Sequence, residues 1–493
     1  MARIRHKHLF LITSILATLL CSSCSFSGDK NAKKDRKEHV KRDLANIKEE
    51  GVLRVITSYS STSYFLYRGQ AMGYEYDLLK RFAKHLDVKL EISVSNDIDV
   101  MFQQLNEGKV DMIAHAITIT NSRKEIVAFS DYLYLTHQVL VQRKPENWRK
   151  LSWSALQASL IHDPIELIGD TVSVTATSSY MARLANLSEE IGGVIHIDTL
   201  TGELSTDRII EMVANGEIKY TVADDNIANI SASYYPELDV RVPISFSQRV
   251  AWALRPQSAE LQQELNSWLK TMKDGVAYYA IYNKYFKNTR DFRRRENSEL
   301  YSLNHNNISP YDDLIKAGAD SLAWDWRLMA AMVFQESKFN PDLESWAGAK
   351  GIMQLMPRTA ERFGVTDRSD PKQSIRAGTE ILKLLWNRFE EIPDSIQRIK
   401  FTMAAYNCGY GHVADARNLA HEEGLDMYRW DENVEESILK LSYPEFYNKS
   451  NIQYGYVRGV EPYTYVRQVF DRFANYSHFI EKEVSEEEAF VKK

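Results

Sequence analysis

Runs of residues typical of β-strands end near residue 308, and this change constrains the fold more than any other feature of the sequence. Before it, strand-like runs such as VLRVITS (52–58) and KLEISVS (89–95) alternate with helical stretches such as YEYDLLKRFAKHLD (74–87). After it, the apolar segments have helical spacing or are apolar throughout. The first pattern predicts an α/β domain with a mostly parallel sheet, and the second predicts a mainly α domain. A chain of 493 residues is long enough for two or three cores.

The α/β region contains two similar series of elements. The second series begins at GDTVSVT (169–175), and its last elements, from QRVAWALR (248–255) onward, are expected to return to the first lobe. We therefore predict a two-lobed α/β domain over residues 48–287. The polar stretch NTRDFRRRENSELYSLNHNN (288–307) is interpreted as a linker, and residues 308–482 as the mainly α domain.

The N-terminus has the features of an export signal. Three basic residues precede LFLITSILATLL, a run of the length expected for a signal sequence and too short to span a bilayer comfortably. The following CSSC resembles a bacterial lipoprotein cleavage box over residues 1–24, which implies that Cys24 is lipidated, although Cys21 stands where Leu is usual. The alternative is an ordinary secretory signal cleaved nearby. Either way the protein leaves the cytoplasm, and Ser25 rather than Asp after Cys24 implies, by the same resemblance, the outer membrane.

Composition narrows the class of partner. The net charge of -6 comes from 61 basic and 67 acidic residues, and this near balance gives no electrostatic reason to expect nucleic acid binding. A sugar polymer or a small ligand fits this charge better. Residues 25–47 are polar and read as a solvated tether, and residues 483–493 form an acidic tail. Of the three Cys, only Cys24 and Cys408 would remain in the mature protein, so no structural disulfide is expected if Cys24 is acylated.

Glu336 stands in an unusual place. It follows the almost continuously apolar run WDWRLMAAMVF (324–334), where a buried helix would normally carry another apolar residue. Burial and the negative end of the helix dipole both disfavour a carboxylate, so both should raise the pKa of this acid. A protonated acid near neutral pH is what a general acid for glycoside cleavage requires. The alternative is a glutamate that turns to solvent or caps a neighbour.

Four motifs within this helical region bear on that choice. In order they are ES (336–337), GAKGIMQLMP (348–357), AAYNCGYG (404–411) and EPYTYV (461–466). Together they resemble the soluble-lytic-transglycosylase type of lysozyme-like domain over about residues 310–480. Each motif is weak alone, and four in the same order are specific.

The resemblance assigns roles to particular residues. It implies that Glu336 is the single catalytic acid/base and that Ser337 is its hydrogen-bonding neighbour. It further implies that Gly351, Met353 and Gln354 form the wall of the sugar groove and that Tyr406 and Asn407 line the cleft. Tyr465 would hold or orient the carboxyl of Glu336. A glycine in the wall lets backbone approach a ligand closely. The alternative for the Tyr and Met residues is core packing.

The number of carboxylates determines the expected mechanism. Ordinary glycosidases use a pair of acids, but Asp342 and Glu344 match no catalytic position and are expected in an exposed loop. With one acid, the resemblance implies cleavage between N-acetylmuramic acid and N-acetylglucosamine of peptidoglycan, with 1,6-anhydro ends and with no metal or cofactor. Two alternatives remain open. One is a lysozyme-type muramidase that uses water, and the other is a solute-sensing lipoprotein with an inactive wall-binding domain.

The α/β domain also resembles a known family. GVLRVITS, AMGYEYDLLKRFAKHL and ITITNSRKEIVAFSDYLY are similar to segments of the periplasmic solute-binding proteins of the amino-acid type. The resemblance implies that Arg123 grips the ligand's carboxylate, a geometry suited to bidentate pairing. Further ligand-binding residues implied in the same way are Thr118, Ser178, Asp224, and Tyr64 or Phe65 over the ligand's side chain. The ligand would be an amino acid or a wall-derived peptide, and the alternative is a domain that keeps the fold without a ligand.

A solute-binding domain in front of a transglycosylase domain resembles the membrane-bound lytic murein transglycosylases. This order implies that the first domain regulates the enzyme or positions it on the wall. The expected partners are peptidoglycan, the small ligand, and a membrane reached through the lipid anchor. The expected location is the periplasmic face of the outer membrane.

Overall fold

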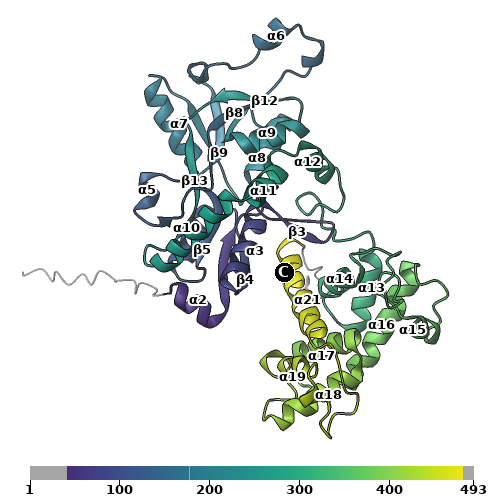
Figure 1. The fold of residues 1–493 in the computed structure, drawn as a ribbon. Coiled ribbons are helices and arrows are strands. Elements are labelled where there is room, and N and C mark those ends of the chain that lie inside the picture. Colours follow the sequence, from purple (N-terminus) through teal and green to yellow (C-terminus); the bar gives the residue numbers. More distant parts are fainter. Residues whose placement is uncertain (1–41, 177, 481–493) are drawn as a thin grey trace, which may run out of the picture. The chain divides into compact units, whose positions relative to one another are not determined.

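The computed structural model describes residues 42–176 and 178–480. Strands occur in the purple-to-teal part of the chain in Figure 1, and the green-to-yellow part is helical. The two-class division predicted from the sequence is therefore present. The signal peptide with Cys24, most of the tether and the acidic tail lie outside the described residues.

The first lobe is built on one mixed sheet with the strand order β4-β1-β5-β13-β6, and β7 also pairs with β13. Its strands are β1 (Val52–Thr57), β4 (Lys89–Val94), β5 (Met112–Thr118), β6 (Ala128–Phe129), β7 (Tyr134–Thr136) and β13 (Gln248–Leu254), with a separate hairpin of β2 (Phe65–Tyr67) and β3 (Gln70–Met72). Its helices are α2 (Leu44–Glu50), α3 (Tyr74–Leu86), α4 (Ile98–Asn106), α5 (Asn121–Lys124), α10 (Ala259–Asp274) and α11 (Val276–Phe286). Apolar residues of α3, α10 and α11 pack on the sheet and form the larger core of this lobe.

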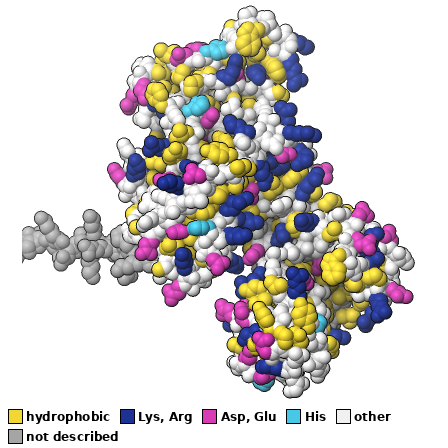
Figure 2. All heavy atoms as spheres, viewed as in Figure 1, with side chains coloured by type: hydrophobic (Ala, Val, Ile, Leu, Met, Phe, Trp, Pro, Cys, Tyr) yellow, Lys and Arg dark blue, Asp and Glu magenta, His cyan; other side chains and the backbone are white. Residues whose placement is uncertain are grey.

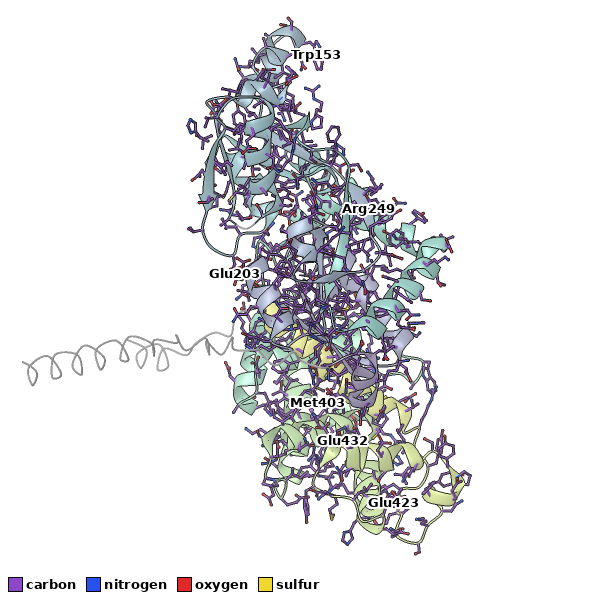
Figure 3. All side chains as sticks on the ribbon, turned by 90° about the vertical axis from the view of Figure 1, so that its left-hand side faces the viewer. Trp153, Glu203, Arg249, Met403, Glu423 and Glu432 are labelled. Carbon is purple, nitrogen blue, oxygen red and sulfur yellow. The ribbon has the colours of Figure 1, made fainter. Side chains whose placement is uncertain are left out.

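The second lobe contains two small sheets, β10-β9 and β11-β8-β12. Its strands are β8 (Gln138–Arg143), β9 (Thr171–Thr175), β10 (His196–Leu200), β11 (Tyr220–Asp224) and β12 (Leu238–Pro243). Its helices are η1 (Trp148–Lys150), α6 (Trp153–Gln157), η2 (Pro164–Leu167), α7 (Ser179–Glu190), α8 (Thr206–Asn215) and α9 (Asp225–Tyr234). Trp153 of α6, labelled in Figure 3, is 69% exposed.

The expectation of a mostly parallel sheet is met in part of the domain, including the pair β9 and β10, and fails in the rest. β1 pairs in parallel with β4 and β5, but β13 is antiparallel to β5, β6 and β7, and β8 is antiparallel to β11 and β12. β13 brings the chain back into the first sheet after the second lobe, as QRVAWALR predicted, and it does so in the opposite direction. A period-two pattern shows which residues of a strand are buried but not the direction of its neighbour.

The C-terminal region is a helical domain with its own core. Its helices are α13 (Asp312–Leu322), α14 (Trp326–Ser337), α15 (Pro357–Arg362), α16 (Pro371–Arg388), α17 (Ser395–Cys408), α18 (Tyr410–Glu422), η3 (Trp430–Val434), α19 (Glu435–Lys440), α20 (Pro444–Tyr447) and α21 (Val460–Phe479). Asp325, Asp370 and Asp394 cap α14, α16 and α17 through their side chains, which explains where these helices begin. α21 packs against both α14 and α17, and Met403 of α17, labelled in Figure 3, is fully buried.

The predicted linker is folded, which corrects the interpretation of residues 288–307. α12 (Thr289–Glu296) buries Phe292 and Arg295, whose spacing places them on one helical face, and Tyr301 is fully buried. The guanidinium of Arg295 lies 5.1 Å from the ring centre of Phe65. Ser302 exchanges hydrogen bonds with Leu66, its amide reaching the Leu66 carbonyl at 3.0 Å. Phe292, Arg295, Tyr301 and Ser302 are the four buried residues of this charged stretch, too weak a signal against the surrounding arginines and asparagines.

The fold also begins before residue 48. Arg42 is buried and its guanidinium lies 2.6 Å from the carboxylate of Asp111, the residue before β5. Asp43 caps α2 and accepts a hydrogen bond from the amide of Leu261 on α10. The end of the predicted tether is therefore part of the first lobe.

The surface agrees with the near-balanced charge of the sequence. On the face shown in Figure 2, basic and acidic side chains are interspersed. Within residues 42–176 and 178–480, no group of three or more His, Cys, Asp or Glu side chains is arranged so that it could hold a metal ion. In the same part of the chain no helix combines the length and apolar character needed to cross a membrane.

Candidate functional site

Glu336 lies in the last turn of α14, as its place at the end of the apolar run predicts. From Trp326 to Phe334 every residue of this helix is buried, so the helix carries the carboxyl to the edge of the core. The hydroxyl of Tyr465, on α21, donates a hydrogen bond of 2.5 Å to Oε1 of Glu336. Burial raises the pKa of Glu336 to about 7, and the bond from Tyr465 acts in the opposite direction. An acid with this pKa can both donate and accept a proton near neutral pH.

Tyr406 belongs to the same electrostatic environment. Burial raises its pKa well above the usual value, and the negative charge of Glu336 adds to the effect, as it does for Tyr465. The Tyr406 hydroxyl donates a 2.8 Å hydrogen bond to the carbonyl of Met353. Asn407, the next residue, is exposed. The structure therefore brings Glu336, Tyr406 and Tyr465 together from three helices.

Gly351 and Gln354 form a tight turn beside the site. Gly351 has a φ of +90°, and a Cβ there would lie 1.9 Å from the carbonyl oxygen of Arg368. The Gln354 side chain donates hydrogen bonds to the carbonyls of Leu343, at 2.9 Å, and Gly351, at 3.0 Å. Gln354 itself has a φ of +49°, in the left-handed region that few residues other than glycine adopt. The turn fixes the direction of this side chain.

Two residues of the predicted site, Ser337 and Met353, have buried side chains that contact the core. Ser337 is buried and donates to the carbonyl of Ile352 at 2.9 Å and that of Val333 at 3.4 Å, and its expected bond to Glu336 is not among the hydrogen bonds of the described residues. Met353 is fully buried, and a Cβ added to Gly378 of α16 would lie 2.5 Å from its Cε. Ser337 thus ties α14 to the 351–354 turn, and Met353 fastens that turn to the core.

The loop between Glu336 and the turn contains an aromatic residue that the sequence reasoning missed. Trp346 is 100% exposed and occupies a turn in which the amide of Gly348 donates to the carbonyl of Ser345 at 2.9 Å. A fully exposed Trp on a hydrogen-bonded turn is unusual. In the sequence, only its position between the ES and GAKGIMQLMP motifs could have drawn attention to Trp346. Asp342 and Glu344, in the same loop, are exposed as expected.

A separate cavity of about 360 Å³ lies between the two lobes of the N-terminal domain. Thr118, Arg123, Ser178 and Asp224 all line it, so four of the residues predicted to bind a ligand are brought together. Tyr64 does not line it.

The cavity has two groups that suit a carboxylate, Arg123 and the N-terminus of α7. Arg123 reaches the carbonyl of Thr118 through Nη1 at 3.1 Å, and burial lowers its pKa. Across the cavity Ser178 caps α7, accepting from the amide of Met181 and donating to the carbonyl of Thr175 at 2.7 Å. A guanidinium and a helix N-terminus facing one space both favour an anion.

Asp224 supplies the opposite charge. It ends β11 and is almost fully buried, and its Oδ1 has no hydrogen-bond partner among the described residues. Burial, with a further contribution from Asp225, raises the pKa of Asp224 to about 7. A buried acid without a partner is costly, so this position suits an incoming amine.

Tyr64 packs in the core of the helical domain, which corrects its predicted place over the ligand. Its hydroxyl hydrogen-bonds Asn475 of α21, and its ring lies 5.0 Å from that of Tyr76 and 4.5 Å from that of Phe479. Phe65, the alternative, is buried against Tyr301. The chain turns into the β2–β3 hairpin here, which directs both rings away from the cavity.

Further residues that line the cavity were not predicted from the sequence. They include Glu75, His115, Tyr134 and Asp207.

Comparisons with known proteins follow the same division of the chain. Residues 33–288 match the family of bacterial extracellular solute-binding proteins, family 3, and residues 313–427 match the transglycosylase SLT domain. A protein of Desulfosudis oleivorans named membrane-bound lytic murein transglycosylase F is 35% identical over 431 residues, which are 87% of this chain and 90% of that protein. The chain belongs to the membrane-bound lytic murein transglycosylase F family.

Other transglycosylase F relatives are similar over the same extent. A Pseudomonas fluorescens protein of that name is 31% identical over 86% of this chain and 85% of its own length. Among solved structures, an ancestral arginine-binding protein bound to arginine is 25% identical, covers 48% of this chain and 98% of its own, and has a TM-score of 0.40. The ancestral amino acid-binding protein that preceded cyclohexadienyl dehydratase is 27% identical, covers 50% of this chain and 99% of its own, and has a TM-score of 0.41.

Proposed function

We propose that this chain is a murein-degrading lytic transglycosylase that cleaves the β-1,4 bond between N-acetylmuramic acid and N-acetylglucosamine. The observation that carries the proposal is Glu336, held by Tyr465 at 2.5 Å with its pKa raised to about 7 by burial. This pair lies in the transglycosylase part of a transglycosylase F family member, whose relatives are named for action on murein. Glu336 supplies the single acid that the proposed chemistry needs.

In the proposed reaction, protonated Glu336 donates its proton to the glycosidic oxygen as the bond from C1 of the muramic residue breaks. The resulting carboxylate then takes the proton of the C6 hydroxyl of the same residue, and O6 bonds to C1. The products are a free C4 hydroxyl and a 1,6-anhydro ring, and Glu336 ends protonated, so no water is consumed. Tyr465 steadies the carboxyl in both states.

The alternative of a hydrolytic muramidase is less well supported. A second carboxylate close enough to act as base or nucleophile is the usual requirement of such enzymes. Asp342 and Glu344, the acids nearest to Glu336 in the following loop, are both exposed. The product separates the two reactions, since hydrolysis gives reducing ends and the proposed route gives anhydro ends.

The test is mass spectrometry of the fragments released from purified murein by the mature chain and by Glu336→Gln. We expect anhydro fragments from the wild type and a loss of about 10²–10⁴-fold in Glu336→Gln. Asp342→Asn is the matched control and should retain full activity. Reducing ends would favour the muramidase, and no release by the wild type would favour the inactive wall-binding domain.

We further propose that the N-terminal domain binds an amino acid or a muropeptide and regulates the enzyme. Arg123 and the N-terminus of α7 would hold the carboxylate, and Asp224 the amine. Contacts between the domains support a regulatory link, since Tyr476 of α21 donates to the carbonyl of Gly69 in the β2–β3 hairpin at 2.7 Å. A Cβ on Gly69 would lie 3.0 Å from the ring of Phe334, two residues before Glu336.

Finally, we propose that Cys24 is lipidated and holds the enzyme on the periplasmic face of the outer membrane. The CSSC motif and the relatives' designation as membrane-bound support this proposal. Fractionation of cells that express Cys24→Ala tests it. The variant should lose its lipid and its sedimentation with outer membranes, whereas unchanged fractionation would remove Cys24 from this role.

A further inference from the structure

Tyr454, in the loop between α20 and α21, has its ring against a glycine of another helix. A Cβ added to Gly411 of α18 would lie 2.4 Å from Cδ1, 2.5 Å from Cε1 and 2.5 Å from Cγ of the Tyr454 ring. An approach along the ring plane would bring one carbon much closer than its neighbours, so these nearly equal distances place the added Cβ over the face of the ring. One face of the Tyr454 ring therefore lies flat on Gly411.

A buried carboxylate holds the loop that carries this ring. Asp415 of α18 is 1% exposed. Its carboxylate accepts hydrogen bonds from three successive amides, those of Gln453 at 2.9 Å, Tyr454 at 2.6 Å and Gly455 at 3.2 Å. Bonds to a charged acceptor are among the strongest hydrogen bonds in proteins. The backbone on both sides of Tyr454 is therefore fixed relative to α18.

The Tyr454 ring is held in one orientation but is not buried. Tyr454 is 59% exposed. The ring of His412 borders it nearly at right angles, with 6.3 Å between the ring centres and 68° between the planes. Because Gly411 covers one face, the exposed area falls on the opposite face and on the hydroxyl end. An exposed Tyr is common by itself, but a ring fixed on one face and open on the other can serve as a platform for a ligand.

This platform lies close to the Glu336 site. A single residue separates α17 from α18, and Tyr406 in the last turn of α17 is near enough to Glu336 to be affected by its charge. Gly411 is five residues from Tyr406, so their Cα atoms are at most about 18 Å apart. Asn407, between the two, is exposed. A polymer bound at Glu336 that continues over this corner reaches the open face of the Tyr454 ring.

The chemistry of a murein glycan suits an aromatic platform. In a β-1,4-linked hexosamine the ring substituents are equatorial, and the axial C–H bonds make each face of the sugar flat and apolar. Such a face can pack on an aromatic ring while the hydroxyl and acetamido groups remain at the rim, and the tyrosine keeps its own hydroxyl in water. The peptide substituents of murein are the alternative occupant.

We infer that Tyr454 is a stacking platform for a sugar ring of the murein glycan, at a subsite away from the cleaved bond. The inference rests on the proposed action on murein and adds one contact to that substrate. Tyr454 belongs to none of the four motifs and lies outside residues 313–427, which match the transglycosylase SLT domain. Because it is separate from Glu336, it contributes to binding of the glycan and not to the chemical step.

The experiment measures binding in the Glu336→Gln background of the mature full-length chain, so that the substrate is not consumed. Binding to purified murein is measured by co-sedimentation, and binding to peptide-free glycan strands, prepared with an amidase, by calorimetric titration. Tyr454→Ala should weaken binding of both about 10-fold, the order of one stacking contact. Tyr454→Phe keeps the ring and should stay within about 3-fold of the parent. Tyr443→Ala removes a tyrosine of similar exposure, 57%, and should leave binding unchanged.

Gly411→Ala tests the support under the ring. The added Cβ displaces the ring without removing it, so this variant should lose binding in the same way as Tyr454→Ala. The double variant should then lose no more than Tyr454→Ala alone, because both changes remove the same contact. Fully additive losses would contradict a platform built by these two residues.

Kinetics of the active chain give a second measurement. Tyr454→Ala should raise the half-saturating murein concentration about 10-fold and change the maximal rate by less than about 3-fold, as expected for a contact made equally before and in the transition state. Unchanged binding of both substrates by Tyr454→Ala overturns the inference, and a loss confined to intact murein assigns the ring to the peptide and overturns it as well. If the wild type releases no fragments from murein, the proposed function fails, whereas the binding measurements still decide the role of Tyr454.

Discussion

Tyr465→Phe gives the sharpest test of how the active site is tuned. The substitution removes one oxygen atom, and with it the 2.5 Å hydrogen bond to Glu336, and leaves the buried ring in place. That bond lowers the pKa of Glu336 against the effect of burial, so its loss raises the pKa above the present value of about 7. A hydrogen bond to a charged group contributes about 1.5–3 kcal/mol, and one pKa unit corresponds to about 1.4 kcal/mol. The expected rise is therefore about one to two units.

The consequence is a change in both the rate and its pH dependence. Glu336 must be protonated to cleave the bond, so the alkaline limb of the profile should move up by about one to two pH units. The carboxyl also loses its orientation, and the maximal rate should fall by about 10- to 100-fold. The assay is release of soluble fragments from purified murein between pH 5 and pH 9, with mass spectrometry of the ends.

Tyr463→Phe is the matched control for this experiment. Tyr463 lies on the same helix but is less buried, with its ring beside Arg467. Its variant should keep both the rate and the profile. If Tyr465→Phe also keeps its alkaline limb and stays within about 3-fold of the wild-type rate, the hydrogen bond does not tune Glu336 and the reasoning is refuted.

Three further substitutions test other parts of the structure. Glu336→Gln should raise the melting temperature more at pH 8 than at pH 5. The pKa of Glu336 is raised to about 7 in the folded chain, so ionising this buried acid destabilises the wild type as the pH rises from the unfolded-state pKa toward 7 and above. The neutral amide of Gln removes that loss of stability. Equal shifts at both pH values in calorimetry would contradict this. Arg123→Lys should weaken binding of a carboxylate ligand roughly 30- to 5000-fold, because an ammonium cannot form the bidentate fork; unchanged affinity in a titration would exclude Arg123 from the contact. Gly351→Ala should destabilise the chain by about 2–5 kcal/mol, since the Cβ meets the Arg368 carbonyl at 1.9 Å. Gly348→Ala, with a φ of +85° but open space around its Cβ, should cost only about 1–2 kcal/mol in the same denaturation series.

The sequence alone determined the features that depend on local order. The end of the strand-like runs near residue 308 predicted two domains of different class, because side-chain periodicity follows the local backbone. The apolar run before Glu336 placed the acid at a helix end, and the order of four motifs predicted the enzyme family to which the chain belongs. The spacing around Arg123 likewise placed it beside a strand end, and in the structure it lines a cavity.

Only the tertiary structure decided which neighbours each side chain meets. Tyr64 and Ser337 have polar groups that could serve a ligand, but the former packs against α21 and the latter bonds the carbonyl of Ile352. Residues 288–307 look like a solvated linker until β2 pairs with them. Glu75 shows the same dependence most clearly, since its residue type matches an exposed helix start and its burial comes from segments distant in the chain. Hydrogen-bond partners and desolvation are properties of the assembled neighbourhood, and a one-dimensional pattern does not contain them.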